Sequence, residues 1–287
     1  NKYQMVLFQE LFHSLLRSSK ILFKKRSVPK IRSKSRQNKT NMKTSHTLFS
    51  SIKGALYTLF LTAFVNNAQA QDNNAALYQQ AIQTSMYPAG NTPDTNLIAI
   101  TPDNPKLRWK KICDQDYVLV VTWKSRKFYP SSGACNTGSY SPIWVTAAPE
   151  LKERMKKELN AKSDTALRLK QMLGLPPNSS YSYFYEMWVR PDDLFRPCPD
   201  KEITDNRCNI CFTAADSADT EYINWINQTR LSRYYACGLY NQYPWTELGY
   251  TYDWNPQNRS HIGLCEFVIR KYSHVYVEKL YTTKEYL

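Results

Sequence analysis

The alternation of apolar and polar residues predicts strands in the second half of the chain. The strongest signal is at residues 117–123, where β-branched and aromatic side chains make both faces apolar, as in a central strand. Other runs are shorter and alternate with a period near two. We expect further strands over residues 143–146, 181–189, 248–254, 263–271 and 274–281.

Helical periodicity separates two of these strands. Pro149 favours a helix start, and apolar residues then recur every four positions as far as residue 159. Ser163 or Asp164 caps a second helix, which Gly174 ends. A third helix is expected over residues 217–235. Helices inserted in blocks between strands predict one α+β domain with a mainly antiparallel sheet and an inserted helical hairpin.

A long loop joins the strand near residue 186 to the third helix. Pro191, Pro197 and Pro199 prevent regular structure in its middle. Residues 186–211 also hold three of the seven cysteines of the chain. A loop of this kind needs something to hold it in place, and disulfides do so in exported proteins. We therefore expect a disulfide-stapled domain.

Residues 42–70 have the pattern of an export signal. Lysines follow Met42, an apolar run of eleven residues occupies 55–65, and an Ala-x-Ala cleavage site occupies 68–70. The run is too short for a membrane anchor, which needs about 20 apolar residues. We expect cleavage after Ala70, a periplasmic or extracellular location, and no membrane span in the mature protein.

The signal divides the chain into four parts. Because a signal peptide works at the N-terminus, we expect residues 1–41 to be an upstream extension that is not native; the alternative is a basic arm that binds nucleic acid. Residues 71–105 are polar and predict a tether or an extended wrap, with one short helix over 74–86. Residues 106–287 form the expected α+β domain.

The positive charge of the chain belongs to the predicted leader. The whole sequence has 38 Lys and Arg against 24 Asp and Glu, a net charge of +14. Residues 1–70 hold thirteen of those basic residues and one of the acidic ones, which leaves a net charge of +2 for residues 71–287. The overall charge therefore gives no support to a nucleic-acid partner.

Cysteine usage favours disulfides. All seven cysteines lie after the predicted cleavage site, and an odd number leaves one thiol unpaired. Cys208 and Cys211 have C-x-x-C spacing, for which a redox motif and half of a zinc site are the alternatives. An oxidising compartment disfavours both alternatives. We predict no cofactor and no metal.

Catalytic candidates are few. Of the four histidines, only His261 and His274 follow the leader, and no nucleophile elbow, zinc-protease motif or phosphate-binding glycine loop is present. Paired carboxylates remain, with Glu186, Asp253 and Glu266 as the candidates and His261 beside them. The alternative for each acid is an ion pair or a turn cap.

Aromatic residues are concentrated near the C-terminus. Trp245, Tyr250, Tyr252 and Trp254 are candidates for a ligand-binding face, and the alternative is that they pack in the core or across strands. A binding module that recognises a cell-envelope glycan or a protein is our first interpretation. A carboxylate-dependent hydrolase acting on glycans or cell-envelope material is the second. The hydrolase requires two carboxylates that face one another in an aromatic-lined cleft.

Four runs of the chain resemble an uncharacterised family of exported bacterial proteins. They are residues 167–177, 188–208 (with Trp-Val-Arg-Pro-Asp-Asp-Leu-Phe-Arg-Pro-Cys), 244–254 (with Leu-Gly-Tyr-Thr-Tyr-Asp-Trp) and 263–269 (with Glu-Phe-Val). The resemblance covers residues 118–270. It implies an exported protein, and it implies no particular activity or catalytic residue.

The same resemblance bears on the cysteines. The family pattern has Ser where this chain has Cys265, so Cys265 is the candidate free thiol. Cys198 with Cys208 is a candidate bridge, and Cys113 with Cys135, which flank the first predicted strand and its loop, is another. The full set of disulfide candidates is Cys113, Cys135, Cys198, Cys208, Cys211 and Cys237.

Overall fold

The computed structural model describes residues 69–87, 93–138, 141–160 and 163–287. All of them belong to one compact unit. The predicted extension, residues 1–41, and nearly all of the predicted signal, residues 42–70, lie outside the described residues. Within the described ranges, no helix has the length and apolar character that crossing a membrane requires.

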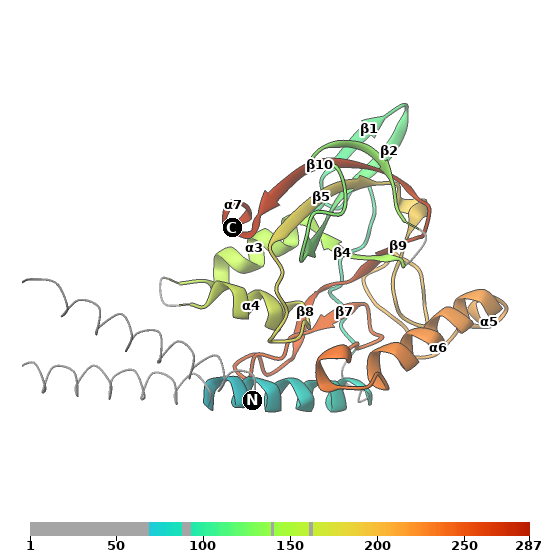
Figure 1. Ribbon diagram of the computed structural model, residues 1–287. Helices are drawn as coiled ribbons and strands as arrows, with labels where there is room; N and C mark the ends of the chain where they lie inside the picture. The colour runs from blue at the N-terminus through green and yellow to red at the C-terminus, as the bar shows by residue number, and fades with distance from the viewer. Residues whose placement is uncertain (1–68, 88–92, 139–140, 161–162) are drawn as a thin grey trace, which may run out of the picture. The chain divides into compact units, whose positions relative to one another are not determined.

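An antiparallel sheet of eight strands is the centre of the fold. Its order is β3-β10-β5-β2-β4-β9-β6, with β1 paired to β2, and β7 and β8 form a separate pair (Figure 1). The strands are β1 Trp109–Ile112, β2 Gln115–Lys124, β3 Gly133–Asn136, β4 Ile143–Ala147, β5 Tyr183–Val189, β6 Leu194–Phe195, β7 Tyr250–Tyr252, β8 Ile262–Cys265, β9 Phe267–Ile269 and β10 His274–Thr282.

The expected class, an α+β domain with a mainly antiparallel sheet, is confirmed. One helix covers residues 69–85, and its buried Tyr78 packs against Trp254. The helices that follow are α3 Ala148–Glu158, α4 Thr165–Met172, α5 Ala214–Ser217, α6 Thr220–Tyr234 and α7 Thr283–Tyr286, with single 3-10 turns η1 Pro191–Asp193 and η2 Leu239–Asn241.

The two faces of the sheet are covered differently. Successive residues of a strand point to opposite faces, so Val118 and Val120 belong to one apolar cluster and Leu119 and Val121 to another. On the second face, the helical pair α3–α4 covers β2 and β5, and α6 covers the β6–β9 end through Ile226. The space between these two covers is where the candidate site lies.

The segment before β1 is a wrap over the first face. Leu97, Ile98 and Ile100 are buried in the cluster that contains Val118. The backbone N–H of Leu97 donates to the carbonyl of Asn206 at 2.9 Å, and Ile100 donates to Ile203 at 2.7 Å. Of the two alternatives for residues 71–105, a tether or an extended wrap, residues 97–100 therefore form an extended wrap over the domain.

The proline-rich loop is held by a buried arginine and by a disulfide. Arg196 is fully buried. Its Nη1 donates to Oδ1 of Asp205 and to the carbonyl of Arg207, both at 2.7 Å, and its Nη2 donates to the carbonyl of Ile98 at 3.2 Å. The bridge between Cys198 and Cys208 closes the same loop. The loop therefore gains its order from both a covalent bond and a polar core.

The other cysteines are free thiols in the structure. Cys113 lies in the turn between β1 and β2 with a positive φ of 49°. Cys135 lies on β3, which β10 and β5 separate from β2 in the sheet order, and both thiols are free, so the suggested bridge between Cys113 and Cys135 is not present. Cys211 and Cys237 are exposed, and Cys265 is buried.

Three short elements differ from the sequence prediction. β1 lies before the first expected strand, residues 117–123, and forms a hairpin with β2. β3 is not among the expected strands, and α5 lies almost entirely before the third expected helix, residues 217–235. Each of these elements is four residues long. Such short elements are stabilised by strand pairing or helix capping, so the apolar–polar pattern of their own residues does not predict them.

Candidate functional site

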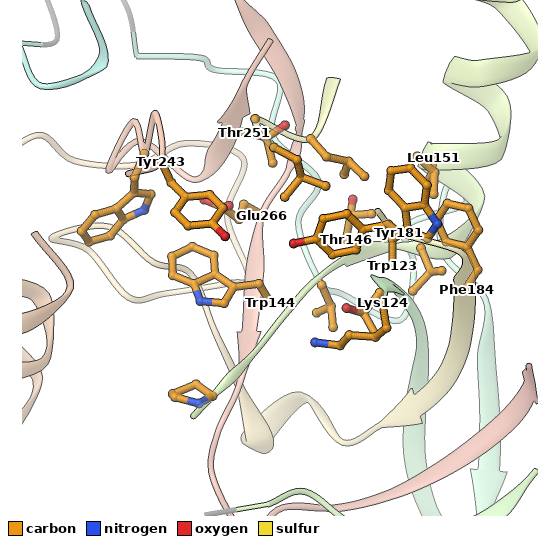
Figure 2. A pocket seen from close by; sticks show the side chains of 18 of the residues that line it. Trp123, Lys124, Trp144, Thr146, Leu151, Tyr181, Phe184, Tyr243, Thr251 and Glu266 are labelled. Carbon is orange, nitrogen blue, oxygen red and sulfur yellow. The ribbon is translucent and has the colours of Figure 1, made fainter. Parts of the chain in front are cut away.

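A pocket lies on the second face of the sheet, between the α3–α4 pair and α6. Its volume is about 380 Å³, at the small end of the range of ~300–1,000 Å³ for ligand sites. Strands β2 and β4 contribute its floor, and the chain after α4 and the segment around Tyr243 contribute its sides. Figure 2 shows most of the side chains that line it, with Trp123, Trp144, Tyr181, Phe184 and Tyr243 labelled among the rings. The ring of Trp245 also lines the pocket.

Glu266 reaches this pocket from the junction of two strands. The residue lies between β8 and β9, and its backbone N–H donates to the carbonyl of Gly249 at 2.9 Å. Leu264 packs with the α3–α4 cluster and Val268 with the α6 cluster. Alternation places Glu266 on the same face, in the interval that neither cluster fills.

The carboxyl group of Glu266 has an unsatisfied oxygen. Its Oε2 is buried and accepts no hydrogen bond from any described residue. Burial raises the pKa of this carboxyl to about 8, against a smaller opposing effect of Arg233. At neutral pH the group is therefore mostly protonated, and it can donate a hydrogen bond as well as accept one.

Trp245 supplies a second unsatisfied polar atom. Its ring is buried and meets Trp144 edge to face, with 5.9 Å between the ring centroids. The hydroxyl of Tyr234 donates to its backbone carbonyl. Its indole Nε1, however, is buried with no acceptor among the described residues. Buried donors are normally paired, so an unpaired donor and an unpaired carboxyl oxygen at one pocket indicate a place for a polar ligand.

Two cations line the pocket with Glu266. The Arg233 guanidinium lies 5.0 Å from the ring centroid of Trp144 and 4.6 Å from that of Tyr243. Lys124, at the end of β2, is partly buried, and burial lowers the pKa of its ammonium to about 8. Neither cation forms an ion pair with a described carboxylate.

Two tyrosine hydroxyls meet across the pocket. Figure 2 shows the side chains of Tyr181 and Tyr243 pointing toward one another. Burial first, and then the neighbouring Tyr243, raise the pKa of Tyr181 to about 12. The hydroxyl of Tyr181 therefore stays protonated at neutral pH and keeps its hydrogen-bonding capacity.

Asp253, a catalytic candidate from the sequence, lies in a fully paired ionic cluster. It is completely buried. Arg168 donates Nη1 to its Oδ1 at 2.9 Å and Nη2 to its Oδ2 at 2.6 Å, and Asn258 donates Nδ2 at 2.8 Å. His261 places Nδ1 2.9 Å from the Asp253 carbonyl and stacks on Tyr252. These contacts give both candidates a structural role.

Glu186 lies apart from Glu266. It lines a second hollow, with Trp188 and Tyr281, rather than the aromatic pocket. Lys152 donates to its Oε1 at 2.8 Å, and the hydroxyl of Tyr281 lies 3.3 Å from its Oε2. Of the three carboxylates named from the sequence, the structure therefore brings only Glu266 into the pocket.

The four aromatic candidates are all buried, so the expectation of an exposed aromatic face is wrong for them. Trp245 and Tyr252 line the pocket. Tyr250 belongs to the core under the wrap, and the indole N–H of Trp254 donates to the carbonyl of Leu175 at 3.1 Å. Two of the four, Trp245 and Tyr252, thus line the candidate site as buried residues.

Several residues of the site were not identified from the sequence. Lys124 is the polar end of the central strand, Arg233 lies near the end of the third helix, and Tyr181 precedes the strand β5. A lysine that ends an apolar strand was the one local signal. Nothing in the sequence indicated that these three residues meet Glu266.

Comparison with known proteins gives no relative: no protein-family model, no curated protein and no solved structure matches the chain. The resemblance to an exported bacterial family therefore stays a prediction. Among the described residues, no group of three or more His, Cys, Asp and Glu side chains is arranged to hold a metal ion. The pocket itself is the basis for assigning a function.

Proposed function

We propose that this protein is an exported binding protein that holds one sugar unit of a cell-envelope glycan in the aromatic pocket. The observation that carries the proposal is the pair of unpartnered polar atoms, Glu266 Oε2 and Trp245 Nε1, at a pocket lined by aromatic rings. Leaving a buried polar group unpaired costs about 1–3 kcal/mol. A ligand that pairs both atoms recovers that cost.

A sugar matches this combination of groups. Each hydroxyl both donates and accepts a hydrogen bond, so it can serve a carboxyl oxygen and an indole N–H at once. The C–H faces of the ring are apolar and pack on flat aromatic side chains such as Trp144 and Tyr181. A purely apolar ligand would leave the two polar atoms unpaired, and a fully charged one would not use the rings.

A hydrolase is the second candidate, and one observation favours it. Glu266 is protonated near neutral pH, which is the state that a general acid needs. Glycoside hydrolysis also requires a second carboxylate within about 5–10 Å. Glu266 is the one carboxylate among the described residues that line the pocket. The structure therefore supports binding better than hydrolysis.

Sugar binding can be measured through the tryptophans of the pocket. We expect N-acetylglucosamine to change the intrinsic fluorescence in a saturable way, because Trp123, Trp144 and Trp245 line the site. Tyr181→Phe, which keeps the ring and removes one donor, should weaken binding several-fold. Tyr272→Phe is the matched control, since Tyr272 is exposed and does not line the pocket.

The result that contradicts the proposal is a fluorescence signal that does not saturate, or one that Tyr181→Phe and Tyr272→Phe change equally. Release of reducing ends from a β-linked oligosaccharide of N-acetylglucosamine, abolished in Glu266→Gln, would favour the hydrolase instead. Glu266→Gln that still binds the monosaccharide, with no release by either protein, favours the binding protein.

Export is a separate part of the proposal. Expression of the full chain in a bacterial host should give a periplasmic protein whose intact mass corresponds to a start at Gln71. A mass that retains Met42 would contradict export while leaving the pocket and its ligand open to the binding experiment.

A further inference from the structure

We propose that the sugar bound in this pocket carries a carboxylate, which lies between Arg233 and Lys124. This inference rests on the proposed function and names its ligand class, an acidic sugar. The inference comes from the two cations that line the pocket. A neutral sugar that contacts only the rings and the two unpaired polar atoms would give these cations no partner.

Arg233 is a cation held against aromatic rings, with no ion pair to any carboxylate in the described part of the chain. Its guanidinium is fixed against the rings of Trp144 and Tyr243, and it forms no ion pair with a described carboxylate. Arg230, one turn earlier on α6, is different: it donates Nη2 to Oε2 of Glu247 at 2.6 Å and Nε to the same carboxylate. One arginine of α6 is thus already paired, and the other keeps its donors for a ligand.

Lys124 is a second cation that forms no ion pair with the residues that the structure describes. The backbone of this residue pairs with Tyr183 at the end of the β2–β5 ladder, and its side chain lines the pocket. Burial disfavours its charged form, as the lowered pKa of about 8 shows. At pH 7 the ammonium is still mostly charged, and a bound anion would offset part of its desolvation.

The one acid of the pocket does not neutralise these cations. Among the described lining residues, the acidic and basic side chains are Glu266, Lys124 and Arg233. With a pKa of about 8, the carboxyl of Glu266 is mostly neutral at pH 7. The pocket therefore carries positive charge when empty, and an anionic ligand is favoured over a neutral ligand of the same shape.

A carboxylate fits these groups better than a larger anion. The planar guanidinium of Arg233 matches a carboxylate with two parallel hydrogen bonds, and the protonated carboxyl of Glu266 can donate to one of its oxygens. A volume of about 380 Å³ leaves room for a sugar ring with a short acidic substituent. Tyr181 and Tyr243 share one hydrogen bond, which leaves one O–H group and the free lone pairs of the two oxygens for the ring hydroxyls.

The test uses two matched pairs of sugars on the full chain at pH 6.5. N-acetylmuramate differs from N-acetylglucosamine by an acidic lactyl group, and glucuronate differs from glucose by a carboxylate. We expect the acidic member of at least one pair to bind at least about tenfold more tightly, because a charge-assisted, partly buried contact is worth that factor or more. Calorimetry and tryptophan fluorescence measure the affinities.

Two variants assign the preference to the cations. Arg233→Met and Lys124→Met should each weaken binding of the acidic sugar several-fold more than binding of the neutral sugar, so that the preference for the acidic sugar falls. Lys127→Met is the matched control, because Lys127 is exposed beside Tyr183 and does not line the pocket. Thermal unfolding of each variant shows that it is folded, and the two substitutions are independent of one another.

The outcomes separate this inference from the proposed function. Equal affinity for the acidic and neutral sugars overturns the acidic ligand and leaves sugar binding intact. Tighter binding of glucose 6-phosphate than of glucuronate overturns the carboxylate in favour of a phosphate. Binding of benzoate without binding of any sugar overturns both proposals, and so does the absence of binding by all of these probes.

Discussion

Two buried carboxyl groups of this protein, Asp253 and Glu266, have opposite surroundings. Asp253 receives both Nη atoms of Arg168, the side-chain amide of Asn258 and the backbone N–H of Asn255. Glu266 keeps a buried oxygen with no described partner, at a pocket lined by aromatic rings. Both follow strands of the small β7–β8 pair, so position along the chain does not explain the contrast.

The difference shows that burial of an acid does not by itself indicate a site. A carboxylate with a full set of donors is stable as a charge and contributes to the fold. A carboxyl without donors is more stable as a neutral acid, and it retains hydrogen-bonding capacity for a ligand. Four substitutions test this distinction.

Asp253→Asn should have the largest effect on stability. It leaves the buried guanidinium of Arg168 with Glu158 as its remaining anion, and breaking a buried pair costs about 3–5 kcal/mol. Urea unfolding at pH 7 measures the change in the free energy of unfolding. Asp116→Asn is the control: Asp116 pairs with Lys111 at 3.6 Å with both side chains more than half exposed, so less than about 1 kcal/mol should be lost.

Equal losses in Asp253→Asn and Asp116→Asn would contradict a structural role for the Asp253 cluster. A loss confined to Asp253→Asn, with sugar binding unchanged in the folded fraction, would support it.

Glu266→Gln should change the pH dependence of stability. The folded pKa of Glu266 is raised from the usual 4.5 to about 8, so the folded state binds the extra proton between these values and wild-type stability falls as pH rises through that window. The glutamine variant has no such loss. We expect it to be more stable than wild type by about 2–4 kcal/mol at pH 9, and within about 1 kcal/mol at pH 5.

Unfolding curves at pH 5, 7 and 9 measure this effect. Arg233 on α6 and Lys124 on β2 are the charged neighbours that line the pocket with Glu266, and Lys124, with a pKa of about 8, stays mostly protonated between pH 5 and pH 7. If the free energies of unfolding of variant and wild type differ by the same amount at all three pH values, the pKa of Glu266 is not raised. The carboxylate would then be paired or solvated in the folded protein.

Lys124→Met should give a smaller effect of opposite pH dependence. The folded pKa is lowered from 10.5 to about 8, so the contribution of Lys124 to stability rises with pH between about 8 and 10.5. The variant should be about 1–3 kcal/mol more stable than wild type at pH 7, and this advantage should disappear by pH 10.5. Lys127→Met, on the exposed side, should show no such crossover.

Tyr181→Phe should have the smallest effect on the unliganded protein. It removes a hydroxyl that contacts Tyr243, and a hydrogen bond of this kind contributes about 0.5–1.5 kcal/mol. The same variant should weaken sugar binding. A loss of sugar affinity that exceeds the loss in the free energy of unfolding would assign the Tyr181 hydroxyl to the site. A large loss of stability with unchanged binding would assign Tyr181 to the fold instead of the site.

The sequence predicts the long elements well because their local signals and their packing agree. The proline at position 149 starts α3, and Asp164 caps α4 by accepting from the N–H of Leu167. The continuous strand expected over residues 263–271 is in fact β8 and β9, because the chain changes partner from β7 to β4 and β6 at residue 266. The alternation of apolar and polar residues does not predict this change of partner strand.

The candidate site is less accessible from sequence than the fold. Glu266 and Trp245 were named as separate candidates, one catalytic and one aromatic, and the structure brings them to the same pocket. Asp253 was equally plausible from its sequence context, because its partner Arg168 lies on a distant helix. Whether a buried acid is paired depends on tertiary contacts of this kind, which composition and spacing do not determine.

The most direct test of the account is the titration of the Glu266 carboxyl carbon by ¹³C NMR in the free protein, assigned with Glu266→Gln. The account predicts a midpoint near pH 8 and a change in the resonance when N-acetylmuramate is added. A midpoint near the usual value of 4.5, with no response to the sugar, would contradict this expectation. Glu266 would then be a paired or solvated acid, and the pocket would not be the ligand-binding site.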